Sequence, residues 1–264
     1  SVDALGNATG FTYDLAGNLI GTTDALGHAS ANTYDPATGR LTQTTDALNR
    51  TTRFAYDSAG NRTSMTDALG NMTRFEYDAS NRLTAQIDPL GNRTAYAYDA
   101  RGNKLTETDP EGHVTRFEYD ASNRLAAIMD PLGNRRSYGY DQSGRKITET
   151  DPLGAVTRFE YDGSGRLKYI TDPLGNRTER RYDARGNLSE LVDPKGNITK
   201  YGYDDLGRLV QVTDAEGGIW TYSYDASGRL LKIIDANNHQ SVTFSYDLTG
   251  RVVAQADALG NTTR

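Results

Sequence analysis

A Tyr-Asp dipeptide recurs twelve times along this chain of 264 residues, at intervals of 21 residues that twice lengthen to 22. Such self-similarity over a whole sequence is typical of a repeat protein, in which one short unit is copied in tandem. No linker, low-complexity tail or change of composition marks a domain boundary, so residues 1–264 are predicted to form a single array of about twelve repeats. The repeated tyrosines are Tyr13, Tyr34, Tyr56, Tyr77, Tyr98, Tyr119, Tyr140, Tyr161, Tyr182, Tyr203, Tyr224 and Tyr246.

Each Tyr-Asp pair opens a short element with Asp first and Gly or Asn last, and a second series of such elements lies between the pairs. Adjacent examples from the two series begin at Asp88 and Asp99 and end at Gly91 and Gly102. Gly and Asn adopt a positive φ most readily, and Asp first with Pro second favours a type I turn. The pattern therefore predicts three-residue hairpin loops closed by a left-handed residue.

Between the turns lie six or seven residues that are rich in Thr, Tyr and Phe and alternate in polarity, as β-strands do. The predicted fold class is all-β: an antiparallel meander of tandem 21-residue hairpins with essentially no helix. About 25 strands spaced by ~4.8 Å would span more than about 100 Å if the sheet were flat. Because sheets of that width twist and curl, we expect the meander to coil into a spiral strip or a segment of a hollow shell.

The repeat length also predicts which side chains share a face of the sheet. If every turn pairs its Asp with the residue four positions on, a residue's face depends on whether its number is odd or even. Because 21 is odd, the signature tyrosine is predicted to switch faces between repeats, and the motif TRFEYD does recur every 42 residues. Duplication of a 42-residue unit would explain the same recurrence. The face switch places Tyr77, Tyr119 and Tyr161 opposite Tyr98 and Tyr140.

Two chemically distinct faces follow from this numbering. One is predicted to be apolar and the other polar, which is the segregation expected of a sheet with a dry and a wet side. The apolar face is predicted to carry Phe75, Tyr77, Leu83, Ala85, Ile87, Ala95, Ala97, Leu105, Phe117, Tyr119, Leu125 and Met129. The polar face is predicted to carry Arg74, Glu76, Arg82, Gln86, Tyr96, Tyr98, Lys104, Arg116, Glu118 and Arg124.

Composition narrows the classes of function. No window approaches 18 consecutive apolar residues, so no membrane span is predicted, and any export signal is expected to lie outside this chain. Of the 35 acidic residues, 25 are turn aspartates, so the net charge of -6 says little about partners. The absence of a basic stripe argues against nucleic-acid binding. The chain has no cysteine and needs no disulfide.

The histidines and the aspartate array are the candidate metal ligands. His28, His113 and His239 each follow a turn at a position where most copies carry Asn, which favours surface turn residues over a metal or catalytic set. Each Asp has a sufficient role in capping its own turn, and no known calcium motif is present. We therefore predict no metal and no cofactor. Trp220, the only tryptophan, is expected to be a packed side chain rather than a ligand platform.

Catalysis needs a unique constellation of groups, such as a nucleophile with its base. A repetitive chain offers every residue type in many equivalent places and singles out none of them. We therefore predict that the protein is not an enzyme and has no catalytic residue.

The unit GNxTxxxYDAxGRLxxxxDPL, represented by residues 91–105 and 175–191, resembles the RHS/YD repeat. That family includes bacterial Rhs polymorphic toxins, the C component of insecticidal toxin complexes and the teneurin YD shell. The resemblance covers the whole chain and implies a β-sheet strip that spirals into a hollow shell, which in bacterial members encloses a C-terminal toxin. The longer core motif with its aspartyl self-cleavage site does not follow the last turn, so we expect a segment of a longer protein.

The resemblance implies a structural function. The chain is expected to be part of an RHS-type shell that encapsulates or presents a C-terminal toxin or other polypeptide cargo. The parent protein is expected to be bacterial and either secreted or located at the cell surface. Containment would place the face with Phe75, Tyr77 and Leu83 inward, away from solvent.

An alternative from a different class is a cell-surface binding module or adhesin. It would recognise carbohydrate or protein through Tyr-rich faces, because exposed aromatic rings stack on sugars. This alternative predicts that Tyr96, Tyr98, Tyr138 and Tyr140 are aligned and exposed to solvent.

Overall fold

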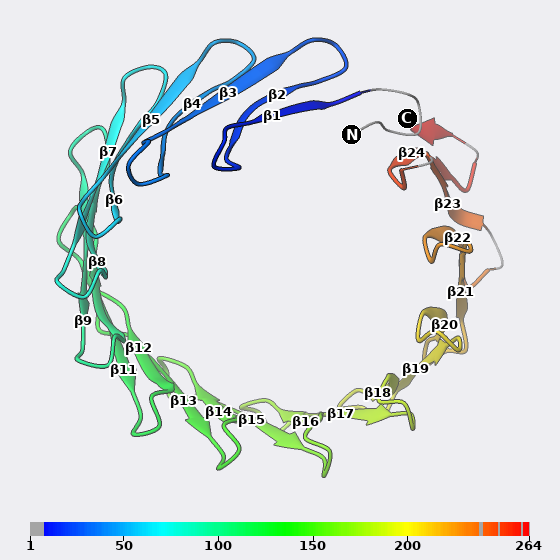
Figure 1. Ribbon diagram of the computed structural model, residues 1–264. Helices are drawn as coiled ribbons and strands as arrows, with labels where there is room; N and C mark the ends of the chain where they lie inside the picture. The colour runs from blue at the N-terminus through cyan, green and yellow to red at the C-terminus, as the bar shows by residue number, and fades with distance from the viewer. Residues whose placement is uncertain (1–7, 238–239, 248, 260, 264) are drawn as a thin grey trace. The chain divides into compact units, whose positions relative to one another are not determined.

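The computed structural model describes residues 8–237, 240–247, 249–259 and 261–263. Within these ranges the chain forms 25 β-strands and no helix (Figure 1). The strands belong to two compact units, Ser1–Arg136 and Ser137–Arg264. In each unit a strand pairs antiparallel with the strand that precedes or follows it in the chain. The predicted all-β antiparallel meander is confirmed.

The strands are short and nearly uniform in length. In the first unit they are β1 (Gly10–Tyr13), β2 (Leu19–Thr23), β3 (Ala29–Tyr34), β4 (Leu41–Thr45), β5 (Thr51–Tyr56), β6 (Arg62–Thr66), β7 (Met72–Tyr77), β8 (Leu83–Ile87), β9 (Arg93–Tyr98), β10 (Lys104–Thr108), β11 (Val114–Tyr119) and β12 (Leu125–Met129). β13 (Arg135–Tyr140) contains the division between the units. The second unit continues with β14 (Lys146–Thr150), β15 (Val156–Tyr161), β16 (Leu167–Thr171), β17 (Arg177–Tyr182), β18 (Leu188–Val192), β19 (Ile198–Tyr203), β20 (Leu209–Thr213), β21 (Ile219–Tyr224), β22 (Leu230–Ile234), β23 (Gln240–Tyr246), β24 (Val252–Asp257) and β25 (Thr262–Thr263).

The turns have the predicted construction. The backbone N–H of Asp88 donates to the carbonyl of Asn92, four residues on, and the N–H of Gly91 donates to the carbonyl of Asp88, both at 3.0 Å. The same two bonds close the turn from Asp99 to Gly102. Gly91 and Gly102 have φ angles of 89° and 92°, in the left-handed region that favours glycine. Three asparagines take the same conformation at the equivalent position, namely Asn49, Asn81 and Asn123.

One β-bulge in each repeat determines the faces of the sheet. The register around the second-series turns is regular, as at Asp88, apart from one shift between Ile233 and Ile234. Around the Tyr-Asp turn, Tyr77 lies opposite Leu83, but the preceding residue, Glu76, lies opposite Ala85. Thr84 is therefore an extra residue in β8 that the register passes over. The same shift follows the other signature tyrosines whose pairing is resolved in both units.

The prediction that the signature tyrosine switches faces is wrong. Side chains along a strand normally point to the two faces in turn, but the bulge residue is unpaired and does not count in this alternation. Each 21-residue repeat therefore contains 20 alternating positions, and equivalent residues of successive repeats lie on the same face. Phe75 lies opposite Gln86, which lies opposite Thr94, and Thr94 shares a face with Tyr98. Within the first unit Tyr77, Tyr98 and Tyr119 therefore share one face, and within the second unit Tyr140 and Tyr161 do.

The predicted composition of the two faces changes accordingly. We call the surface that carries the signature tyrosines the tyrosine face. Its strand residues include Phe75, Tyr77, Leu83, Gln86, Tyr96, Tyr98, Lys104, Phe117, Tyr119 and Leu125 in the first unit. The opposite face of that unit carries Arg74, Glu76, Ala85, Ile87, Ala95, Ala97, Arg116, Glu118 and Met129, so the predicted apolar and polar sets are each divided between the two faces.

The 42-residue recurrence is real, and it appears on the opposite face as alternating ion pairs. Arg93 on β9 reaches across β8 to Glu76 on β7, with an N–O distance of 2.7 Å. Arg135 and Glu118 make the same bridge across β12, and Arg177 and Glu160 make it across β16. Where the intervening repeat would need a glutamate, it carries alanine or glycine, as in Ala97 and Gly139.

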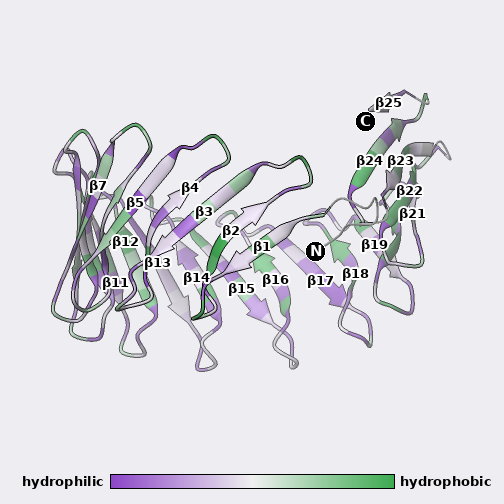
Figure 2. Cartoon of the chain, turned by 45° about the horizontal axis from the view of Figure 1, so that its top comes forward, coloured by the Kyte–Doolittle hydropathy of each residue, from purple (hydrophilic) through white to green (hydrophobic). Residues whose placement is uncertain are grey.

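The sheet has almost no interior. Among the residues described, only Ala85 and Ala127 are fully buried, each on a strand crossed by one of these bridges. The accessible surface is 16795 Å², whereas a compact globular protein of this mass would expose about 11,000 Å². Hydrophilic and hydrophobic residues are mixed along most strands, and β17 is mainly hydrophilic (Figure 2). The described part of the chain contains no helix that is long and apolar enough to cross a membrane.

Candidate functional site: the tyrosine face and its turns

The signature tyrosine connects each repeat to the one before it. The Tyr98 hydroxyl donates to the carbonyl of Leu83, fifteen residues earlier, at 2.8 Å. Leu83 directly precedes the bulge residue Thr84, so the hydroxyl supplies a donor where the bulge interrupts the backbone ladder. Equivalent bonds of 2.7 to 3.2 Å are made by Tyr34, Tyr56, Tyr77, Tyr98, Tyr119, Tyr161, Tyr182, Tyr224 and Tyr246.

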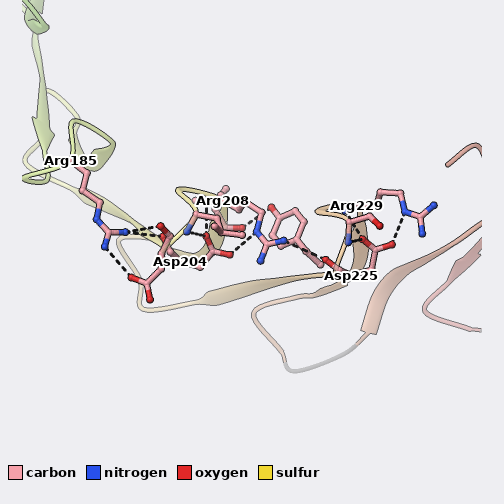
Figure 3. Close-up of polar contacts among 10 residues, drawn as sticks. Arg185, Asp204, Arg208, Asp225 and Arg229 are labelled. Carbon is pink, nitrogen blue, oxygen red and sulfur yellow. Dashed lines mark hydrogen bonds and ion pairs between the residues drawn. The ribbon is translucent and has the colours of Figure 1, made fainter. Parts of the chain in front are cut away.

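An arginine at the end of many Tyr-Asp turns extends this connection (Figure 3). Arg208 donates through Nε to the carboxylate of Asp204 in its own turn at 2.7 Å, and through Nη1 to the carbonyl of Asp225 in the next turn at 3.4 Å. Its guanidinium carbon lies 4.8 Å from the ring centroid of Tyr224, within the range of a cation–π contact. Arg229 repeats the pattern one repeat later. The result is a ladder of Arg, Asp and Tyr along the turns.

Hydrogen bonds stabilise the charged form of many turn aspartates. The backbone N–H of Arg208, and after it the guanidinium of the same residue, lower the pKa of Asp204 although partial desolvation opposes them. At Asp88 the side-chain amide of Asn92 is the largest cause, and the pKa of that carboxyl is again lowered. Capping by hydrogen bonds to the charged form explains both shifts. The turn-capping role predicted for these carboxylates is confirmed, since Asp88 accepts hydrogen bonds from the backbone N–H groups of its own turn.

The tyrosine face carries half-buried cations between aromatic rings. The Lys104 ammonium lies 5.7 Å from the ring centroid of Tyr96 and 4.4 Å from that of Phe117, and it pairs with Glu107 at 2.6 Å. Lys146 occupies the same position 42 residues later, between Tyr138 and Phe159. Tyr96 and Tyr138 are therefore half-buried under these cations, and Tyr98 and Tyr140 are half-buried as well. All four are aligned within their units, but they do not have the open exposure that the adhesin alternative predicts.

Some residues depart from the aromatic pattern of this face. Arg180 stands two positions before Tyr182, where the other repeats carry Phe or Tyr except for Asn32, and its Nη1 atom is buried without a hydrogen-bond partner among the described residues. Trp220 is half-buried on the tyrosine face opposite Val212, in agreement with the packed role expected for it.

The histidines act in the turns. The Nδ1 atom of His28 lies 2.8 Å from the carboxylate of Asp24, and that of His113 lies 2.9 Å from Asp109. These are the contacts that Asn92 makes with Asp88 in another copy, so the predicted turn role is confirmed for both. His239 lies outside the described residues. Asp109, His113 and Glu111 place potential ligand atoms within 4.8 Å of one another, but two of the three are exposed and no further protein ligand joins them in the part of the chain that is described.

Sequence reasoning missed the bulge and the arginine ladder. An odd repeat length requires either a face switch or one bulge per repeat. The constant tyrosine in every copy favours the bulge, because a face switch would place it in two different environments. The residue just after the Tyr-Asp turn was a second signal, because every copy carries either Arg or Asn at this position, as in Arg82 and Asn103.

Comparison with known families and structures agrees with this geometry. The model for the Teneurin YD-shell matches residues 7–197, and the model for the RHS repeat matches residues 182–219, 203–240 and 224–263. No curated protein matches the sequence.

Several solved structures share the fold. They include TcdB2-TccC3 without its hypervariable C-terminal region, at 18% identity and a TM-score of 0.60 over 96% of this chain, and TcdB2-TccC3-Cdc42, at 19% and 0.54 over 96%. A third is the Photorhabdus luminescens Tc holotoxin pore, at 15% and 0.55 over 94% of the chain. The chain spans only 18 to 20% of the length of these proteins. The family models, which together extend over nearly the whole sequence, show that this chain belongs to the Teneurin YD-shell family of RHS-repeat proteins.

Proposed function

We propose that this chain forms part of a shell wall that encloses or presents a polypeptide cargo, such as a toxin domain at the C-terminus of a longer protein. The observation that carries the proposal is the uncovered tyrosine face. Phe75, Phe117 and Phe159 are only half-buried, and no second layer of the described chain packs over them. Such a face can hold a partly unfolded polypeptide through apolar and aromatic contacts.

The role is structural rather than catalytic. The carboxyl groups with lowered pKa values are turn aspartates, whose hydrogen bonds close their own loops, and Glu179, which is paired with Arg181. These groups therefore already have structural roles. The family to which the chain belongs is a shell and repeat fold. A wall of this kind acts by keeping the enclosed cargo apart from its surroundings. We expect the parent protein to be bacterial and either secreted or located at the cell surface.

The tyrosine face is assigned to the cargo side for a physical reason. The opposite face of the first unit carries the Arg93–Glu76 and Arg135–Glu118 bridges, whose charged groups remain about half exposed and are best left in water. The tyrosine face instead places Lys104 between two rings and pairs it with Glu107. The charges of Lys104 and Glu107 therefore already have partners when an apolar cargo covers this face.

The containment test uses the parent protein. Its cargo should resist protease under conditions in which the separately produced cargo is degraded. Digestion of the enclosed and the free cargo at the same rate would contradict containment.

A second test uses this chain alone with a defined probe, reduced and carboxymethylated α-lactalbumin, which stays unfolded. The chain should bind the probe, and the double variant Phe75→Ser with Phe117→Ser should weaken binding at least about tenfold. The matched control changes Ile87 and Met129 to Ser on the opposite face of the same unit. Equal losses of probe affinity in both variants would reject the assignment of the tyrosine face to the cargo. If the chain bound glycans on an array and not the probe, the adhesin alternative would be favoured.

A further inference from the structure

The second-series turns of the first unit carry a row of exposed leucines. Leucine occupies the third position of these turns, and because alternate turns of a meander lie at opposite ends of the strands, these turns all lie at one end. The side chains are 70 to 88% exposed. We call this row the leucine rim, and it consists of Leu26, Leu48, Leu69, Leu90 and Leu132. Glu111 takes the position between the last two, so the first four are consecutive.

The turns do not require these leucines. Leu90 contributes its backbone N–H to the carboxylate of Asp88 at 2.9 Å, and Ser80 makes the same bond to Asp78 at 2.8 Å in a Tyr-Asp turn. At the opposite end of the strands the third position carries Ala, Ser, Thr or Arg in every copy except Leu206. Single exposed leucines need no explanation, but a periodic row confined to one end of the strands indicates an interaction surface.

The spacing of the rim identifies what fits it. Successive leucines are separated by two strands, or about 10 Å, because neighbouring strands lie ~4.8 Å apart. A gap of that width admits one further aliphatic side chain between each pair. The leucine rim of a second copy of this chain has aliphatic side chains at the same interval over four turns, so it matches these gaps. The adjacent carboxylates keep their charge while they accept hydrogen bonds from their own turns, so the contact should tighten as salt screens their repulsion.

We infer that the leucine rim is the contact surface between two copies of this chain. The copies lie with their rims antiparallel around a two-fold axis close to Leu69, about a quarter of the interval toward Leu48. Leu69 of one copy then lies beside Leu69 of the other, and the four consecutive leucines of each copy interdigitate with those of the other. A self-complementary patch of this kind forms a closed dimer rather than a filament. The contact is narrow, so the dimer is weak and forms at high micromolar concentration. This inference does not depend on the cargo proposed above.

Sedimentation equilibrium from about 10 µM to about 1 mM tests it. The average mass should rise from 28.9 kDa toward twice that value as the concentration increases. The triple variant Leu48→Ser, Leu69→Ser and Leu90→Ser should raise the dimer Kd at least about tenfold. Serine occupies this turn position at Ser80 and Ser122, so the turns are kept. The matched control, Leu15→Ser with Leu206→Ser, removes exposed leucines from the other end of the strands and should leave the Kd unchanged.

Cysteine cross-linking gives an independent reading, because the chain has no native cysteine. Leu69→Cys should form a disulfide-linked dimer on mild oxidation, and Leu206→Cys should not. A wild-type chain that stays monomeric to 1 mM would overturn the inference, as would equal effects of the triple variant and its control. Binding of the rim to lipid vesicles or to the cargo, without self-association, would assign it to a different occupant and would also overturn it.

Discussion

At the scale of single residues, the signature tyrosine acts through its hydroxyl as well as its ring. Tyr98 donates to the carbonyl of Leu83 beside the bulge, and the Arg82 guanidinium lies 5.0 Å from its ring centroid. A phenylalanine would keep the ring and its cation contact but lose the donor. The hydroxyl is therefore the feature that separates this tyrosine from a generic aromatic residue.

Tyr98→Phe should lower the free energy of unfolding by about 1 kcal/mol, because one partly buried hydrogen bond is lost. Urea unfolding followed by circular dichroism measures the change. Tyr13→Phe is the control, since the Tyr13 hydroxyl has no hydrogen bond to the described residues and the side chain is 58% exposed. If Tyr98→Phe lowered the free energy of unfolding no more than Tyr13→Phe does, the ring of Tyr98 and not its hydroxyl would account for its contribution.

The residue that closes a turn is selected by backbone conformation. Gly91 has a φ of 89°, and nothing lies within 4 Å of the place where a Cβ would be, so a substitution there meets strain but no steric clash. Gly91→Ala should destabilise the chain by about 1 kcal/mol, whereas Gly91→Asn should cost less, since Asn49 already stands in this conformation. Thermal unfolding of the two variants compares them. An alanine variant as stable as the asparagine variant would show that the left-handed conformation is not what selects glycine.

At the scale of the elements, the turns make stability depend on pH. The pKa values of Asp88, Asp99 and Asp204 are lowered in the folded chain by hydrogen bonds to their charged forms. A folded pKa below the unfolded value of about 3.9 means that the stabilisation is complete well above that value and is lost as pH falls through the folded values. The urea midpoint should be nearly constant from about pH 5 to 7 and should decline below about pH 4. A midpoint at pH 3 equal to that at pH 7 would contradict the role of these carboxylates.

The bulge is the element on which the common tyrosine face depends. Deleting Thr84 removes the extra residue, which would turn every side chain after it on β8 to the other face or break the pairing with β7. The deletion should destabilise the chain by at least ~2 kcal/mol, measured by urea unfolding. Deleting Ala37 is the matched control, because it shortens a five-residue turn to the length of the others and leaves the strands unchanged. Equal effects would show that the bulge does not set the register.

The elements also show what the sequence could and could not predict. Turn positions depend on the local preferences of Asp, Pro, Gly and Asn, so the turns that begin at Asp88 and Asp99 could be located without coordinates. The faces depend on pairing between strands, and one unpaired residue such as Thr84 inverts them. Nothing in the composition of β8 distinguishes Thr84 as a bulge residue. The contacts of Lys104 could not be predicted, because they depend on which side chains share the tyrosine face.

At the scale of the whole molecule, each described strand contacts its chain neighbours within its own unit and little else there. Folding such an array depends on local contacts, so stability should propagate from repeat to repeat rather than arise in one core. In the first unit, amide hydrogens of β1 should exchange faster than those of β7 to β9, because all four residues of β1 are exposed. Hydrogen exchange followed by mass spectrometry resolves the two regions. Uniform exchange across the unit would instead indicate a single cooperative core.

The large accessible surface has a thermodynamic consequence for the chain as a whole. The folded chain exposes 16795 Å², and unfolding would expose about 42,000 Å² for this mass, so the change is about 25,000 Å² rather than the ~30,500 Å² of a compact protein. Since the denaturant m-value scales with that change, it should be about four-fifths of the value for a compact domain of equal length. Urea unfolding at a concentration below the dimer Kd measures it, with a compact 264-residue protein as reference. An m-value equal to that of the reference would mean that the two faces of the sheet are covered in solution, whereas the reduced value leaves the tyrosine face free to receive a partner.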